Sequence, residues 1–117
     1  MTNRPPLDRG DVLLVRFPFT DLSAQKRRPA LVIGRPSGDD LVLAFVTSNI
    51  TVIDAQAEHL LRPDDPEFRR TGLKTASLVR LNRIATLHRS LVQRRLGHIG
   101  PQTLQAIGRR LRHVFAL

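Results

Sequence analysis

Short apolar runs occupy most of this chain, and only its C-terminal end has the period of a helix. Short runs separated by proline, glycine and aspartate are typical of β-strands. Gly100-Pro101 is a helix-start signal. The apolar positions after it recur at spacings of three and four: Leu104, Ile107, Leu111 and Val114. The pattern predicts a mainly β (α+β) protein, a small β-barrel or curled sheet with a C-terminal α-helix.

The apolar runs locate the expected strands. They lie at 11–17, 29–34, 41–47, 75–80, 83–87 and 91–99, with a short edge pair at 52–53 and 58–61. Residues 62–72 hold two prolines and alternating charges, so we expect a loop or a single helical turn there. Residues 1–9 are predicted to be a flexible arm. Without a linker or a repeat, the 117 residues are expected to form one domain, 1–117.

The composition argues against several classes of protein. The chain has no cysteine, which excludes disulfides and thiolate metal sites and is compatible with the cytoplasmic location that we expect. Its four histidines are dispersed, and it has no glycine-rich phosphate loop, so neither a metal nor another cofactor is expected. The first residues lack the apolar core of a signal peptide, and no apolar run approaches the ~20 residues of a membrane span. We therefore expect a soluble protein.

The distribution of charge points to an anionic partner. The formal net charge is +9, all of which falls on residues 61–117, and no acidic residue follows Glu67. Seventeen of the nineteen cations are arginine, whose planar guanidinium binds phosphate through two donors. A nucleic acid is the first candidate for such a partner. With five phenylalanines and no tryptophan or tyrosine, binding should depend on phosphate contacts more than on base stacking.

A run of three cations, Lys26-Arg27-Arg28, lies directly before the strand expected at 29–34. Pro29 disfavours helical backbone at Arg28 and so fixes the direction in which that side chain leaves the chain. Cations fixed at the mouth of a strand can hold a phosphate in one place. The run could equally serve only to make a hairpin soluble.

Two further polar patches accompany apolar runs. Thr47, Ser48 and Asn49 stand in a row at the end of the run at 41–47, where site residues are common, although serine and asparagine also favour turns. If residues 79–83 are extended, Arg80 and Asn82 point to the same face. Together they could bind a phosphate and a base edge, or they could form the polar face of an antiparallel sheet.

Taken in order along the chain, these patches resemble the MazF/PemK family of toxin ribonucleases. Arg28-Pro29-Ala30-Leu31-Val32-Ile33 matches the Arg-Pro-x-Leu-Val-Ile strand of that family and is the most specific motif here. The likeness also includes the opening 9–12, the strand end at 46–48 and the segment 72–80. It extends over nearly the whole chain.

The resemblance implies an SH3-like barrel of the CcdB/PemK type with a terminal helix, arranged as a homodimer. It implies a toxin of a type II toxin-antitoxin system that cleaves single-stranded RNA at selected sequences without a metal, and an acidic antitoxin that occupies the RNA groove. The catalytic arginine and threonine of the family correspond to Arg28 and Thr47. The neighbouring residues Lys26, Arg27, Ser48, Arg80 and Asn82 are expected to bind the substrate.

The chain departs from the family at two places. Some members carry an aspartate two residues after the second arginine, where this chain has Asn82, and an amide cannot act as a general base. The loop before the Arg-Pro strand lacks the Glu-Gln pair of many members. Two other functions therefore remain: a module that binds nucleic acid without cutting it, and a CcdB-like toxin directed at a protein.

Overall fold

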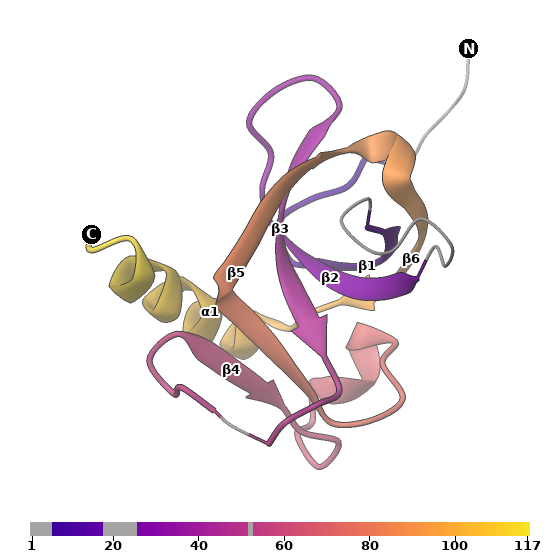
Figure 1. Ribbon diagram of the computed structural model, residues 1–117. Helices are drawn as coiled ribbons and strands as arrows, with labels where there is room; N and C mark the ends of the chain where they lie inside the picture. Colours follow the sequence, from indigo (N-terminus) through magenta and orange to yellow (C-terminus); the bar gives the residue numbers. More distant parts are fainter. Residues whose placement is uncertain (1–5, 18–25, 52) are drawn as a thin grey trace.

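The computed structural model describes residues 6–17, 26–51 and 53–117, and these form one curled antiparallel sheet with a helix across it (Figure 1). The sheet order is β4-β5-β3-β2-β1-β6. The strands are β1 (Asp11–Arg16), β2 (Arg27–Gly34), β3 (Asp40–Thr47), β4 (Glu58–Leu61), β5 (Ser77–His88) and β6 (Val92–His98). Two 3₁₀ turns, η1 (Phe68–Thr71) and η2 (Arg89–Leu91), precede and follow β5, and α1 (Pro101–Val114) ends the fold. The mainly β fold with a terminal helix is confirmed.

The sheet curls strongly but does not close into a barrel. Within the described residues β4 pairs only with β5, and β6 only with β1, so these two strands are the edges. A closed barrel was therefore too specific a prediction. The expected edge pair also differs, because Glu58–Leu61 pairs with β5 and not with residues 52–53, of which residue 52 lies outside the described part.

The two strands expected at 75–80 and 83–87 are one long strand. β5 pairs with β3 along both halves, but Ala44 is opposite Ile84 whereas Phe45 is opposite Arg80. Residues 81–83 therefore form a bulge, which bends the strand. The first half of β5 also pairs with β4, and the second half continues the curl toward β6 (Figure 1).

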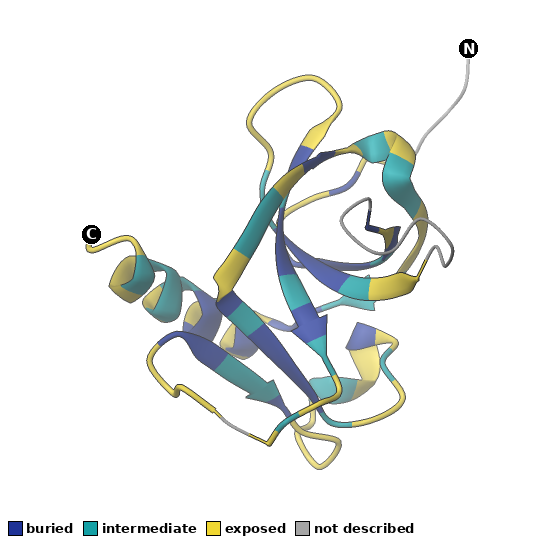
Figure 2. Cartoon of the chain, in the orientation of Figure 1, coloured by how far each residue is buried: buried dark blue, intermediate teal, exposed yellow. Residues whose placement is uncertain are grey.

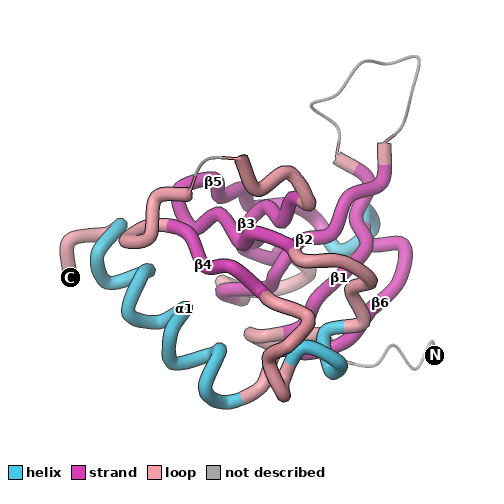
Figure 3. The backbone as a smooth tube through the Cα atoms, turned by 90° about the horizontal axis from the view of Figure 1, so that it is seen from below, coloured by secondary structure: helices cyan, strands magenta, loops and turns pink. Residues whose placement is uncertain are grey.

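Both faces of the central strands are buried, which explains their nearly continuous apolar sequence. On β1, Leu13 and Val15 belong to one core cluster, whereas Val12 belongs to a second cluster with Leu31 and Val79. Alternate residues of a strand point to opposite faces. The second cluster includes Ile107 of α1, whereas the first contains no residue of the helix. The buried stretches of the central strands are dark blue in Figure 2, and Figure 3 shows α1 lying along one side of the sheet.

The predicted arm spans residues 1–9, of which 1–5 lie outside the described residues. Leu7 is only 4% exposed and packs in the first core cluster. The Asp8 carboxylate accepts a hydrogen bond from Arg35 at 2.9 Å, and the Asp8 backbone N–H donates to the Asp11 carboxylate at 2.8 Å. The described end of the arm is thus packed against the sheet.

The start of α1 is capped by a residue distant in sequence. Its N-cap is Gly100, which has no side chain to accept the first N–H groups. The carboxylate of Glu67 accepts from the backbone N–H of Thr103 at 2.9 Å, from its hydroxyl at 2.8 Å and from Gln102 N–H at 3.1 Å. A carboxylate there also interacts favourably with the helix dipole.

We expect Glu67→Gln to lower the free energy of unfolding at pH 7 by about 1 kcal/mol, the usual loss for a helix cap. Burial raises the pKa of Glu67, but the hydrogen bonds from Thr103 and Gln102 and the charge of Arg70 outweigh it, and the net pKa is lowered. Because its pKa is lower in the folded state, ionised Glu67 stabilises the fold at pH values above its pKa in the unfolded chain, near 4.5. This stabilisation is lost as the pH falls through the pKa of the folded state.

Urea denaturation of wild type and Glu67→Gln at pH 7 and pH 3 would measure this effect, and the difference between them should shrink at pH 3. Asp64→Asn is the matched control, because Asp64 is an exposed acid in the same loop and pairs only with Arg62 among the described residues. Equal differences at both pH values would contradict the assignment.

Candidate functional site

The two residues expected to be catalytic lie on neighbouring strands at the same end of the sheet. Arg28 is near the start of β2, and Thr47 ends β3. β2 and β3 are antiparallel, with Ala30 opposite Phe45. Continuing that register by two residues places Arg28 level with Thr47, at the ~4.8 Å spacing of paired strands.

Arg28 and Thr47 also line a common pocket. This pocket, of about 200 Å³, is lined by Phe17, Arg28, Pro29, Phe45, Val46, Thr47 and Arg80. Its wall includes the rings of Phe17 and Phe45, whose centroids are 4.7 Å apart. Three residues from three strands, Arg28, Thr47 and Arg80, thus come together, and we call this space the Arg28 pocket.

A second pocket of about 380 Å³ shares its wall with the first, through Arg28, Pro29, Val46 and Thr47. It also contains Arg27 and Ser48, two of the residues expected to bind substrate. Its far wall is formed by Lys74 and Thr75, in the segment before β5, and by Arg94 of β6. We call it the Arg94 pocket.

A buried carboxylate fixes the position of Arg80. Nε of Arg80 donates to Oε2 of Glu58 at 2.7 Å, and the Glu58 side chain is only 4% exposed. The other Glu58 oxygen accepts the backbone N–H of Asp54 at 2.7 Å. This bond uses Nε, and the terminal nitrogens of Arg80 make no hydrogen bond or ion pair with another described residue. Arg80 also lines a small hollow with Thr47 and Asn49.

The backbone beside Thr47 orients its hydroxyl. Thr47 Oγ1 accepts the backbone N–H of Asn49 at 3.1 Å. A hydroxyl that accepts one bond keeps its own hydrogen for donation. Thr47 lines the Arg28 pocket, so this hydrogen is available to a ligand there.

Other predicted residues lie apart from these pockets. Lys26 is exposed just before β2 and lines neither pocket. Asn82 is exposed in the bulge of β5 and also lines neither. Their binding roles stay predictions. The loop in which the Glu-Gln pair was missing, residues 18–25, lies outside the described residues.

Sequence reasoning missed Glu58, Lys74 and Arg94. Glu58 was assigned only to an edge strand, and its burial could not be read from a four-residue run. Lys74 precedes a strand much as Arg28 does, which was a signal that could have been used. Arg94 lies in a strand with a polar exposed face and has no local signal at all.

The Arg94 pocket is positively charged, and no acidic side chain among the described residues that line it offsets this charge. Its cations are Arg27, Arg28, Lys74 and Arg94. Arg16 lies directly opposite Arg27 on the paired strands β1 and β2. Like charges in that arrangement destabilise a sheet, and a bound anion would relieve the repulsion.

Within the part of the chain that the structure describes, the remaining ionisable groups do not form a metal site. In the described part of the chain, no three histidine, aspartate or glutamate side chains lie close enough to hold an ion. Burial and the charge of Arg110 lower the pKa of His59 to about 4, so this histidine is neutral at pH 7. It lies on β4 and is absent from the walls of both pockets.

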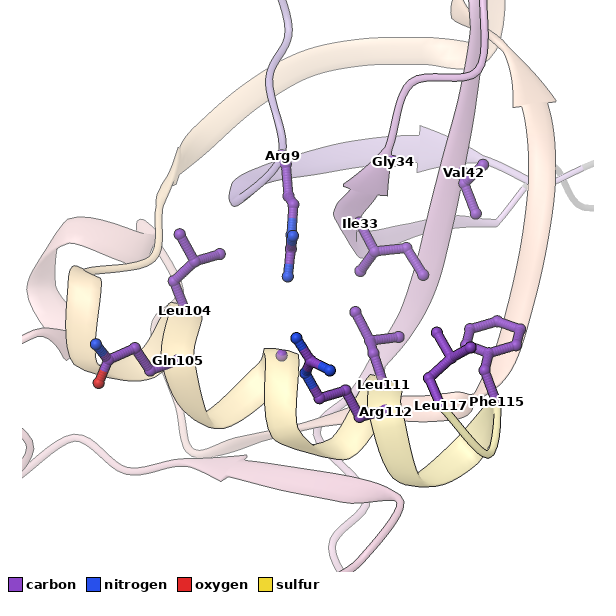
Figure 4. Close-up of a pocket in the computed structure, with 11 residues that line it drawn as sticks. Arg9, Ile33, Gly34, Val42, Leu104, Gln105, Leu111, Arg112, Phe115 and Leu117 are labelled. Carbon is purple, nitrogen blue, oxygen red and sulfur yellow. The ribbon is translucent and has the colours of Figure 1, made fainter.

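A cavity of about 640 Å³ lies between α1 and the sheet and is mostly apolar (Figure 4). Ile33, Val42, Leu111 and Phe115 line it, and Arg9 and Arg112 point into it from opposite sides. Its described lining contains no side-chain hydroxyl or carboxylate. It therefore lacks the side-chain hydroxyl groups that line the Arg28 and Arg94 pockets, which we call together the strand-end pockets.

A curled basic sheet with an arginine and a hydroxyl at one strand end defines a class of small β proteins equipped to hold an anionic ligand. The particular family is shown by sequence: the model of the PemK-like, MazF-like toxins of type II toxin-antitoxin systems matches residues 8–115. The chain belongs to this family.

Solved structures agree on the fold. An endoribonuclease in complex with its cognate antitoxin, from a mycobacterial species, has a TM-score of 0.72 and 21% identity, with 97% of each chain covered. The Mycobacterium tuberculosis toxin MazF-mt6 has a TM-score of 0.70 and 19% identity, covering 92% of this chain and 97% of the other. MazF from Deinococcus radiodurans has a TM-score of 0.67 and 19% identity, covering 95% and 97%.

A search of curated proteins found no significant match. Among the described residues, no helix has both the length and the apolar character needed to span a membrane.

Proposed function

We propose that this protein is the toxin of a type II toxin-antitoxin pair and acts as a metal-independent endoribonuclease on single-stranded RNA. The observation that carries this proposal is the pocket in which Arg28, Thr47 and Arg80 meet. The proposal is further supported by the family to which the chain belongs and by the structural neighbours named as endoribonucleases.

The chemistry uses the nucleophile that RNA itself carries. The 2′-hydroxyl attacks the adjacent phosphorus, a new P–O2′ bond forms, and the P–O5′ bond breaks. The products are a 2′,3′-cyclic phosphate, or its hydrolysed 3′-phosphate, and a 5′-hydroxyl. The enzyme must hold the attacking oxygen in line and stabilise the negative charge that develops on the phosphate oxygens.

Arg28 is assigned to that developing charge, because its guanidinium is always protonated and can donate two parallel hydrogen bonds. Thr47 donates its free hydroxyl hydrogen to a phosphate oxygen or orients the 2′-hydroxyl. Arg80 supplies a second cation, with Glu58 as its positioning residue. Glu58 is already engaged by Arg80 and by Asp54 N–H, so it is poorly suited to be the general base.

Three further features belong to the proposal. The antitoxin would be an acidic polypeptide that occupies the same basic surface; one structural neighbour is bound to its cognate antitoxin. The toxin would act as a homodimer in the cytoplasm, where its RNA substrate lies. DNA should bind but resist cutting, because it has no 2′-hydroxyl.

Incubation with labelled total RNA, followed by mapping of new 5′ ends, tests the activity. We expect cuts at discrete sequences, with 5′-hydroxyl ends, and the same cuts at an equal rate in excess EDTA. Loss of cleavage in EDTA, restored by added divalent ions, would contradict the metal-independent mechanism. A matched DNA strand is the control and should remain intact.

The second candidate is a module that binds RNA without cutting it. It is favoured by one observation: Asn82 takes the place of the carboxylate that some family members carry, so no base is assigned. Binding without new 5′ ends would support this alternative. Neither binding nor cutting would point to a protein target.

A further inference from the structure

We propose that the Arg94 pocket is a second phosphate site, in which Arg27, Lys74 and Arg94 hold a phosphate adjacent to the one being cleaved. The ligand class is a phosphodiester of the same RNA strand. The inference rests on the proposed function, since it assigns the Arg28 pocket to the scissile phosphate. It adds Lys74 and Arg94 to the residues that contact the substrate.

The sheet itself brings these cations together. Leu14 of β1 is opposite Pro29 of β2 on one side and opposite Arg94 of β6 on the other. Arg94 therefore lies two strands from the Arg-Pro motif, about 10 Å at the usual strand spacing. All three of these residues line the pocket.

A close backbone approach fixes the other wall. A Cβ added to Gly72 would lie 2.1 Å from the backbone oxygen of Leu96, and one added to Gly97 would lie 2.1 Å from that of Arg70. The chain after η1 is thus held directly against β6. Lys74, two residues after Gly72, lines the pocket together with Arg27.

The lining suits a phosphate and not a base. Thr47, Ser48, Thr75 and Ser77 add hydroxyl groups to the four cations, and the described lining contains no aromatic ring. Sites that hold bases of single strands use aromatic platforms, whereas the backbone is held by cations. Among the described residues no hydrogen bond or ion pair involving the side chains of Arg27, Lys74 and Arg94 is recorded, so these groups are available to a ligand.

The pocket also lies where a neighbouring nucleotide must pass. It shares four lining residues with the Arg28 pocket, including Arg28 and Thr47 themselves. An RNA strand whose scissile phosphate lies at Arg28 can therefore continue into the Arg94 pocket without passing over another helix or β-strand. An isolated anion site elsewhere on the surface would have no such continuity.

The test removes the cations and the phosphates separately. The ligand is a short RNA that the wild type binds and that 2′-deoxy substitution makes uncleavable. It is prepared as a series in which one phosphate at a time is replaced by a neutral methylphosphonate. For wild type we expect affinity to fall at the scissile phosphate and at one neighbour. Lys74→Ala/Arg94→Ala should bind the unmodified RNA about 10-fold more weakly. Methylphosphonate at that neighbour should then lower affinity much less than it does in wild type, with Arg27 alone accounting for the remaining decrease.

The salt dependence gives a second readout. For a single strand, the slope of log K against log salt should become shallower by about 0.7 for every phosphate that the variant no longer neutralises. The control is Arg83→Ala/Arg112→Ala, which removes the same charge from exposed positions that line neither strand-end pocket. Its methylphosphonate profile should equal that of wild type.

An unchanged profile in Lys74→Ala/Arg94→Ala, or a decrease in affinity no larger than in the control, would overturn the second site. Failure of the proposed function would look different. In that case wild type would give no new 5′ ends in total RNA, while the methylphosphonate scan could still show two sensitive phosphates.

Discussion

Arg28→Ala should lower the single-turnover rate of RNA cleavage on the order of 10²-fold or more, while leaving the fold intact. One fixed donor to a developing negative charge commonly contributes this much. Arg28 is exposed, and within the described residues no side-chain hydrogen bond or ion pair of Arg28 is recorded, so its removal should not destabilise the sheet. Rapid-quench cleavage of a short RNA at saturating enzyme measures the rate, and urea denaturation checks the fold.

Two variants show whether the charge or its position matters. Arg28→Lys keeps the charge but loses the planar fork, and it should recover only part of the rate. Lys26→Ala removes a cation two residues away that lines neither pocket, and it should weaken binding without changing the saturated rate. Cleavage by Arg28→Ala at the wild-type rate would remove Arg28 from the mechanism.

The sequence predicted the strands best where apolar runs are bounded by turn residues. β2, β3 and α1 were all expected within a few residues of their observed bounds. β5 was divided in two because Asn82 and Arg83 interrupt the apolar run, and only pairing with β3 and β4 shows that they form a bulge. The prediction of a closed barrel was wrong for a similar reason, because closure depends on whether the edge strands β4 and β6 pair with each other.

The site was predictable where its residues lie beside a local signal. Arg28 is marked by the proline after it, and Thr47 by its place at the end of an apolar run. Arg94 enters the site only because β6 pairs with β1, a contact between residues about eighty positions apart in sequence. Glu58 lies on the four-residue edge strand β4, directly opposite Arg80 of β5. Neither of these two contacts could be predicted from the local sequence.

Gly97→Ala should lower the free energy of unfolding by about 3 kcal/mol. The new Cβ would lie 2.1 Å from the Arg70 carbonyl oxygen and 2.5 Å from the Thr71 carbonyl carbon. Both atoms are backbone, so no side chain can turn aside, and η1 must move away from β6. For a small domain with about 5–15 kcal/mol in total, such a loss is a large fraction.

Urea denaturation followed by circular dichroism would measure this loss, with Gly34→Ala as the matched control. A Cβ at Gly34 meets only Val42 side-chain atoms, at 3.5 Å, which is ordinary contact, so that variant should unfold near the wild-type midpoint. Because η1 leads into Lys74, the displaced turn in Gly97→Ala should also weaken RNA binding through the Arg94 pocket. Equal stability of the two variants would mean that η1 and β6 do not approach as closely as the structure places them, and the wall of that pocket would have no fixed position.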